Sequence, residues 1–274
     1  MSIVLSGASQ LQSEINAAFW ADKSVPELSI EIIATKSSPS KLEGFTLNAS
    51  RLGERVTATI GTSEEHAFRY ALNALLKWIN NGGTTISMDD GPDFPIRGVV
   101  EGFYGKAWSH EQRLRGLKLF GDYNMNTYFL APKDVSWQRF NWRTLFGDEF
   151  LSLTAELIQA GRSHAVDIVV CVSPGLSVKY SDHNDVIAVV DRYKQLFDLG
   201  ARHFGLLWDD IAWELSHPED IEAYVSTAAA HADFSNSVWA ELLKLDSNLK
   251  LTVCPMHYSG RGNEPYLLEL GRQL

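Results

Sequence analysis

The fold is decided by a short apolar run, DIVVCV, at residues 167–172. A strand with one wet face alternates apolar and polar side chains, whereas a strand covered on both faces is apolar throughout. This run is of the second kind, which is typical of a parallel sheet. Working outward from it, we expect similar strands at 98–104, 126–131, 203–208 and 251–254.

Long helical stretches separate these strands. One opens at Ser109 with a capping box, and another buries Val186, Val189 and Val190 before it stops at Gly200. Repeated βα units of this size predict an α/β fold, most economically a (β/α)8 barrel of the TIM type. Such a barrel needs ~250 residues and only about five strands fit here, so we expect a truncated barrel whose C-terminal part is missing.

The first 92 residues have a different pattern, which predicts a small α+β domain. Strands are expected near 3–5, 28–34, 45–48 and 55–60, and helices at 10–20 and 64–79. Val56, Ala58 and Ile60 alternate with polar side chains, which predicts a sheet with one wet face. The stretch DDGPD at 89–93 breaks the periodicity and indicates a linker. The predicted domains are therefore residues 1–92 and 93–274.

Composition argues against several classes of partner. The formal net charge is −10 without a basic stripe, so we expect neither nucleic acid nor a membrane as a partner. No apolar run approaches the ~18 residues of a membrane span. The N-terminus shows no secretory signal, and Cys171 and Cys254 lie inside apolar runs, so we expect a cytoplasmic protein. The eight histidines lack ligand spacing, and we expect no metal and no cofactor.

In a parallel sheet, chemistry is expected at the carboxyl ends of the strands, where loops and helix N-termini converge. Each strand expected here ends in polar or aromatic residues. The five ends are EGFYG (101–105), APKD (131–134), SPG (173–175), WDD (208–210) and CPMHY (254–258). This pattern predicts a site at one edge of the sheet.

Asp209 and Asp210 are the sharpest candidates for chemistry. Two adjacent carboxylates repel each other, which favours one of them staying protonated and acting as a general acid. Glycosidic bond cleavage requires a pair of carboxylates with such divided roles. The alternative is that both residues cap a following helix and stay ionised in solvent.

The other polar residues carry weaker signals when taken singly. Lys133 alone would be an ordinary surface lysine, and Tyr104 and Tyr258 would be packing or rim aromatics. Gly102 could serve a turn only. Three tryptophans in the loops after the first two strands could stack on sugars, but half-buried packing is an equally good interpretation for them: Trp108, Trp137 and Trp142.

Taken together and in order, five strings are specific. They resemble glycoside hydrolase family 84, the β-N-acetylglucosaminidases that include protein O-GlcNAcases and bacterial enzymes once called hyaluronidases. The resemblance covers the chain from about Arg97 onward, and the leading region resembles the small domain that precedes the barrel in these enzymes. The strings are RGVVEGFYGKAW, NMNTYFLAPKD, VSPGL, LLWDDI and TVCPMHY.

The resemblance implies a retaining, substrate-assisted mechanism on N-acetylglucosamine-bearing glycans or glycoproteins. The acetamido oxygen of the sugar attacks its own anomeric carbon to form an oxazoline, an exception to the usual two-carboxylate scheme. Asp209 would accept the acetamido N–H and orient that group. Asp210 would act as general acid and then as general base.

The remaining candidates follow from the same resemblance as substrate-binding residues. Tyr258 would bind the acetamido oxygen or the developing oxazoline, and Cys254 would line the acetamido pocket. Gly102, through its carbonyl, and Lys133 would bind sugar hydroxyls, and Tyr104 belongs to the same set.

Two departures from the family pattern leave other hypotheses open. The family's remaining pocket residues lie downstream of a position like Leu274, and His257 stands where relatives often have an acidic residue. One alternative is therefore a truncated, non-catalytic N-acetylglucosamine-binding remnant. Another is an unrelated barrel enzyme whose carboxylates hold a divalent ion, which the lack of a further ligand at nearby strand ends disfavours.

Overall fold

The computed structural model describes residues 1–23, 25, 27–259, 261–262 and 264–274, and the chain divides into two compact units. The first unit comprises residues 1–99, 111–127 and 159–166, and the second comprises residues 100–110, 128–158 and 167–274. The boundary between residues 92 and 93 that the sequence favours stays a prediction.

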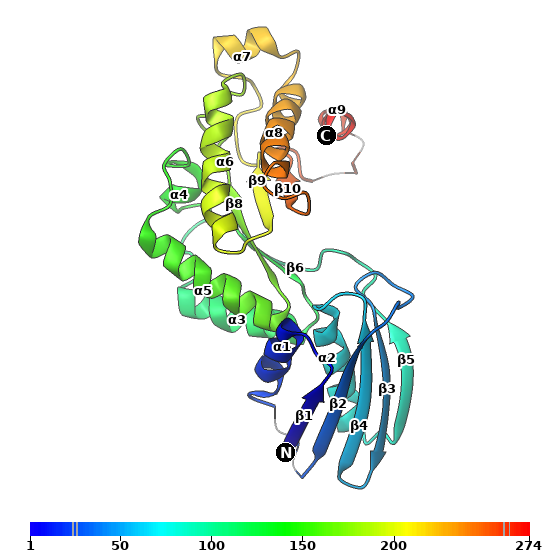
Figure 1. Ribbon diagram of the computed structural model, residues 1–274. Helices are drawn as coiled ribbons and strands as arrows, with labels where there is room; N and C mark the ends of the chain where they lie inside the picture. The colour runs from blue at the N-terminus through cyan, green and yellow to red at the C-terminus, as the bar shows by residue number, and fades with distance from the viewer. Residues whose placement is uncertain (24, 26, 260, 263) are drawn as a thin grey trace. The chain divides into compact units, whose positions relative to one another are not determined.

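The first unit is built on a five-stranded mixed sheet with the strand order β1-β2-β4-β3-β5 (Figure 1). Strands β1, β2 and β4 are parallel, and β3 runs antiparallel to β4 and β5. The elements are β1 (Ser2–Ser6), α1 (Gln10–Trp20), β2 (Ser29–Lys36), β3 (Phe45–Leu52), β4 (Arg55–Thr62), α2 (Ala67–Asn80) and β5 (Thr85–Asp90).

Alternation along β4 produces the two faces of this sheet. Val56, Ala58 and Ile60 are buried in one core with side chains of α1 and α2. Thr57 and Thr59 lie on the opposite face, where they line a hollow together with other polar residues and with Ile33 and Ile86. The prediction of a sheet with one wet face is confirmed.

Strand β5 was not expected, and the prediction of a linker at 89–93 is wrong in its first part. Asp89 and Asp90 end β5, where they pair with Thr46 and Phe45 of β3. Polar side chains are common on an edge strand, because only one side of its backbone is hydrogen-bonded to the sheet. Such a strand carries little of the apolar pattern by which strands are recognised.

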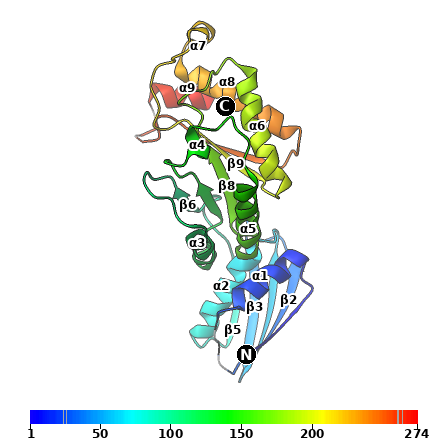
Figure 2. The same cartoon turned by 90° about the vertical axis from the view of Figure 1, so that its left-hand side faces the viewer.

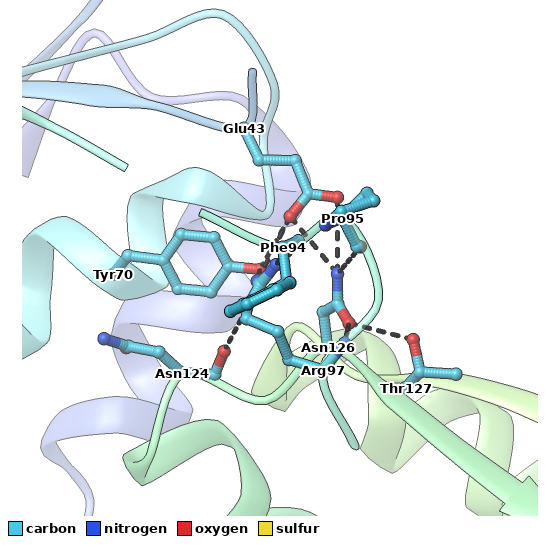
Figure 3. Close-up of polar contacts among 8 residues, drawn as sticks. All are labelled: Glu43, Tyr70, Phe94, Pro95, Arg97, Asn124, Asn126 and Thr127. Carbon is cyan, nitrogen blue, oxygen red and sulfur yellow. Dashed lines mark hydrogen bonds and ion pairs between the residues drawn. The ribbon is translucent and has the colours of Figure 1, made fainter. Parts of the chain in front are cut away.

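A polar cluster in this unit, the Arg97 cluster, consists of Glu43, Tyr70, Arg97 and Asn126 (Figure 3). Arg97 donates to the Tyr70 hydroxyl at 2.7 Å and to the Glu43 carboxylate at 3.2 Å. The Asn126 amide donates to Glu43 at 3.2 Å and to the Pro95 carbonyl at 2.8 Å. Burial raises the pKa of the Tyr70 phenol, with the Glu43 charge adding to the effect, so this hydroxyl stays protonated.

A second sheet has the order β10-β9-β8-β7-β6, in which neighbours in sequence are neighbours in space. Figure 1 labels β8, β9 and β10 of this sheet, and Figure 2 shows β8 and β9 from another side. Strands β8, β9 and β10 are parallel, and within the described residues the sheet is open. The five expected strands are confirmed as β6 (Gly98–Glu101), β7 (Thr127–Leu130), β8 (Asp167–Val172), β9 (His203–Leu207) and β10 (Lys250–Cys254).

Helices follow the strands of this sheet, as the βα pattern predicts. Helix α6 ends near Gly200, whose φ of +100° suits glycine. The helices are α3 (His110–Asp122), α4 (Ser136–Arg139), α5 (Asp148–His164), α6 (His183–Asp198), α7 (Pro218–Ala223), α8 (Thr227–Leu243) and α9 (Pro265–Gln273). None of the helices in the described part of the chain is long and apolar enough to cross a membrane.

Close packing between β8 and β9 fixes the strand that leads into the aspartate pair. Every residue of β9 is buried. A Cβ atom on Gly205 would lie 2.4 Å from the sulfur of Cys171 on β8, so only glycine permits this approach. The Tyr193 hydroxyl of α6 donates to the Gly205 carbonyl at 2.6 Å. The end of β9 is thereby held in place.

Candidate active site

The carboxyl ends of β7 and β9 meet in a buried ion pair. The Nζ atom of Lys133 lies 2.5 Å from Oδ2 of Asp209. Lys133 is only 3 % exposed, so its interpretation as an ordinary surface lysine is wrong. The other carboxylate oxygen of Asp209, Oδ1, is buried and has no hydrogen-bond partner among the described residues. Asp209 therefore offers one free acceptor next to a fixed positive charge.

Asp210 has a different hydrogen-bond partner from its neighbour Asp209. Its φ of +57° is left-handed, and its Oδ2 accepts a hydrogen bond of 2.9 Å from the Tyr104 hydroxyl. No helix starts at this point, because the next described helix, α7, begins at Pro218. The alternative of an aspartate pair that caps a helix is therefore wrong.

Arg139 is a residue of this site that sequence analysis missed. It is buried at the end of α4, and its guanidinium donates to the Tyr104 hydroxyl oxygen and to the Asp210 carbonyl oxygen, each at 2.7 Å. A guanidinium can only donate. The Tyr104 oxygen therefore accepts from Arg139 and directs its own proton to the Asp210 carboxylate. The only signal in the sequence is that Arg139 lies in the same loop region as Lys133.

The loop at 102–108 is closed by a buried carboxylate at the end of β6. Glu101 is fully buried; it accepts a 3.0 Å hydrogen bond from the Trp108 N–H and another from the Tyr128 hydroxyl. Because both ends of the loop are fixed to Glu101, the intervening residues have a defined path.

Two further bonds tie the same loop to the end of β7. The Lys133 N–H donates to the Phe103 carbonyl at 3.2 Å, and the Gly105 N–H donates to the Asp134 carboxylate at 2.6 Å. Gly102 precedes Phe103, so the structure brings this candidate alongside Lys133. Tyr104 lies between the two bonds, and burial together with the hydrogen bond to Asp210 raises the pKa of its phenol.

Cys254 lies half-buried at the end of β10, packed against Ala131, Cys171 and Leu207. Burial, followed by the negative charge of Asp209, raises the pKa of its thiol to about 11. The group is therefore neutral near pH 7 and forms an apolar, polarisable wall beside the aspartate.

Tyr258 follows Cys254 and is largely exposed, at 64 %. It lines a cavity of about 310 Å³ together with Asp210. The structure thus places Tyr258 beside Asp210, whereas Lys133 and Cys254 surround Asp209.

The three tryptophans considered for sugar stacking are engaged in packing. Trp142 is fully buried and donates to the Ser177 hydroxyl at 3.0 Å. Trp108 stacks on Tyr128, and Trp137 packs against aromatic side chains of α5 and the segment before it. In the part of the chain that the structure describes, no three histidine, cysteine or acidic side chains are placed to hold a metal.

Comparison with known proteins identifies the family. A family model described as β-N-acetylglucosaminidase matches residues 97–274. The chain belongs to this family, glycoside hydrolase family 84. The prediction made from the sequence motifs is confirmed.

Relatives within this family are considerably longer. The protein O-GlcNAcases of Rattus norvegicus and Mus musculus are each 32 % identical over 183 residues, which cover 65 % of this chain but 20 % of theirs. A mutant of the Thermobaculum terrenum O-GlcNAc hydrolase is similar at 34 % identity with a TM-score of 0.65, over 66 % of this chain and 39 % of that one. CpGH84B is similar at 27 % identity with a TM-score of 0.77, over all of this chain and 51 % of that one.

Proposed function

We propose that this family 84 chain releases terminal β-linked N-acetylglucosamine from glycans or glycoproteins by retaining, substrate-assisted catalysis. One observation carries the proposal. Asp209 is ion-paired through one oxygen and leaves its other oxygen buried without a partner in the described structure. A buried acceptor of this kind costs free energy unless a ligand donor completes it.

In this mechanism the free oxygen of Asp209 accepts the acetamido N–H of the sugar. The amide oxygen thereby gains electron density and is held against the anomeric carbon, which raises its effective concentration there. Lys133 fixes the orientation of the Asp209 carboxylate through their ion pair. Cys254, neutral at pH 7, provides the apolar wall along which the acetamido methyl group lies.

Asp210 completes the proton transfers. As the amide oxygen bonds to the anomeric carbon, the bond to the leaving oxygen breaks and that oxygen takes the Asp210 proton. Water then attacks the anomeric carbon of the oxazoline and gives a proton to Asp210, which restores the amide and the acid. Two inversions give net retention. Tyr104 and Arg139 keep Asp210 in place, and Tyr258 and Gly102 bind the sugar.

The proposed architecture is that of the family. Strands β6 to β10 would be the first five strands of a (β/α)8 barrel with the site at its carboxyl edge. Residues 1–92 would form the small domain ahead of a catalytic region starting at residue 93. We also propose that the substrate is bound without a metal or other cofactor.

The test is hydrolysis of aryl N-acetyl-β-glucosaminides whose acetamido methyl group carries zero to three fluorine atoms. Fluorine withdraws electrons from the amide oxygen, so the expected rate falls steeply with each fluorine and the sugar is released in the β configuration. A rate that ignores fluorination would contradict substrate assistance. Binding of N-acetylglucosamine without turnover would favour the non-catalytic alternative.

A further inference from the structure

Trp213 differs from every other tryptophan of the chain in its exposure. All eight tryptophans lie within the described residues, and Trp213 alone among them is exposed, at 60 %. It lies three positions after Asp210 in the loop that follows β9. Single exposed apolar side chains are common, so the exposure of Trp213 matters here because of the residues with which it lines a cavity.

The indole does not stand alone. Its ring contacts the His257 imidazole edge-on, with 5.6 Å between ring centroids and 76° between planes. Both rings line the 310 Å³ cavity into which Asp210 and Tyr258 also face. Two loops, after β9 and β10, therefore combine to build an aromatic wall next to the carboxylate assigned as the acid.

We propose that Trp213 and His257 form the aglycone subsite, and that its occupant is a neutral sugar ring. The inference rests on the proposed function, because the general acid protonates the oxygen between the released sugar and the aglycone. Whatever follows that oxygen must lie beside Asp210 on the side away from Asp209. The cavity lined by Trp213 and His257 adjoins Asp210, while Lys133 and Cys254 surround Asp209.

The chemistry of the cavity favours a sugar ring over other aglycones. A pyranose has an apolar C–H face that fits an indole, and hydroxyls around its edge that suit the polar groups of His257, Tyr258 and Ser259. Asp210 is the one acidic residue among the described residues that line the cavity, and no lysine or arginine is among them. An anionic sugar or an acidic peptide would thus find no lysine or arginine in this lining with which to pair.

The volume of the cavity also favours a single sugar ring. A cavity of about 310 Å³ lies at the small end of the range for ligand pockets, roughly 300 to 1,000 Å³. It can hold a single ring, whereas a polypeptide aglycone would need contacts that extend well beyond it. We therefore commit to a glycan, with a sugar ring rather than a peptide as the leaving group.

The experiment compares Trp213→Ala with the unaltered chain on two substrates. One is a β-linked disaccharide of N-acetylglucosamine, which has a sugar aglycone; the other is methyl N-acetyl-β-glucosaminide, which has almost none. Loss of ring stacking is expected to lower kcat/KM about tenfold for the disaccharide and less than about twofold for the methyl glycoside. Trp213→Phe should retain most of the activity on the disaccharide, and Tyr123→Ala, an exposed aromatic of the first unit, should change neither rate.

Two other results would contradict the proposal. Equal losses on both substrates would overturn the subsite, because Trp213 would then support the whole site. A larger loss on an O-linked glycopeptide than on the disaccharide would replace the sugar with a polypeptide as the occupant.

Failure of the proposed function itself is distinguishable. If the unaltered chain turns over no substrate, calorimetry with the disaccharide and with free N-acetylglucosamine still decides the inference. Trp213→Ala should then weaken disaccharide binding selectively by about tenfold, and equal affinities of the variant and the unaltered chain for the disaccharide would overturn the subsite.

Discussion

An arginine, a tyrosine and a carboxylate come together in two clusters of this molecule, one in each unit. In the first unit, Arg97 donates to Tyr70 and Glu43. In the second unit, Arg139 donates to Tyr104, which donates to Asp210. Both clusters contain the same three kinds of group, but only the second belongs to the proposed active site.

The difference lies in how completely the polar groups are paired and how far they are exposed. Tyr70 is 3 % exposed, and both carboxylate oxygens of Glu43 accept hydrogen bonds. Tyr104 is largely exposed, and the buried Oδ1 of Asp209, next to Asp210, has no described partner. A saturated cluster stabilises a fold, whereas an unsaturated cluster that is held rigidly can bind a ligand. The comparison predicts which substitutions affect stability and which affect turnover.

The largest effect is expected at Lys133, which serves both purposes. Lys133→Met leaves the buried Asp209 carboxylate without its cation, so the free energy of unfolding should fall by about 3 kcal/mol. The kcat/KM on an aryl N-acetyl-β-glucosaminide should fall at least about 100-fold. Urea unfolding and steady-state kinetics measure the two effects. Retained kcat/KM with lowered stability would place Lys133 in the structural class with Arg97.

The matched arginines should separate turnover from stability. Arg139→Met frees the Tyr104 proton and the Asp210 backbone, so kcat should fall by about 30-fold with little change in KM. Arg97→Met should leave kcat unchanged but lower the free energy of unfolding by about 2 kcal/mol, because Glu43 and Tyr70 lose a donor.

A conservative variant checks that geometry causes the effect of Arg139. Arg139→Lys keeps the charge but cannot donate to two oxygens in a fork, so it should recover only part of kcat. Equal losses of kcat in Arg139→Met and Arg97→Met would contradict the distinction between the two clusters.

Substitution of the two tyrosines should separate turnover from stability in the same way, with smaller effects. Tyr104→Phe removes the donor to Asp210 from an exposed ring, so kcat should fall about tenfold while stability stays within about 0.5 kcal/mol. Tyr70→Phe removes a hydroxyl from a saturated, buried cluster, so stability should fall by about 1 kcal/mol without a kinetic effect. Thermal unfolding and kinetics on both variants measure the contrast; a reversed pattern would contradict it.

Acid should affect the second unit more than the first, through gradual loss of stability. Burial lowers the pKa of His231 to about 3 and that of His203 to about 4, both in the second unit, and that of His164 to about 4 in the first. Each of these histidines is neutral in the folded protein, and below pH ~6.5 it gains a proton when the protein unfolds. Stability is therefore fully present above pH ~6.5 and falls as the pH drops from there toward 4, by at most about 1.4 kcal/mol per pH unit for each histidine.

Hydrogen exchange followed at pH 7 and pH 5 tests this at the level of the two units. Protection should decrease more in the second unit, and His231→Gln should reduce the decrease there. His183→Gln, an exposed position of α6, is the control and should leave the pH dependence unchanged. Equal loss of protection in both units would contradict the assignment of acid sensitivity to the buried histidines.

Sequence patterns predicted the features that depend on neighbouring residues in the chain. The apolar runs of β8 and β9 identified buried strands, and the position of Asp209 and Asp210 after β9 identified the edge where a site lies. Strand β5 was missed because its edge position allows Asp89 and Asp90, which resemble a turn. Local patterns cannot separate an edge strand from a loop when neither buries much apolar surface.

Arg139 and Trp213 were missed for a different reason. The burial of Arg139 depends on its bond to the Asp210 carbonyl, 71 positions further along the chain. The contact between Trp213 and His257 likewise joins two loops that only the sheet brings together. An arginine in a short helix and a tryptophan in a loop have no periodicity that indicates such partners. Conversely, Trp142 lies in a loop yet is fully buried.

Asp210→Asn tests the role of Asp210 as general acid on a pair of N-acetyl-β-glucosaminides, one with a poor leaving group and one with an activated aryl leaving group. Glu43→Gln, from the saturated cluster, is the matched control and should leave both rates unchanged. An acid that protonates the departing oxygen matters only when that oxygen is a poor leaving group. We expect a loss in kcat/KM of about 1,000-fold for the poor leaving group and a far smaller loss for the activated one. Equal losses on both substrates, or wild-type rates on the poor one, would contradict it.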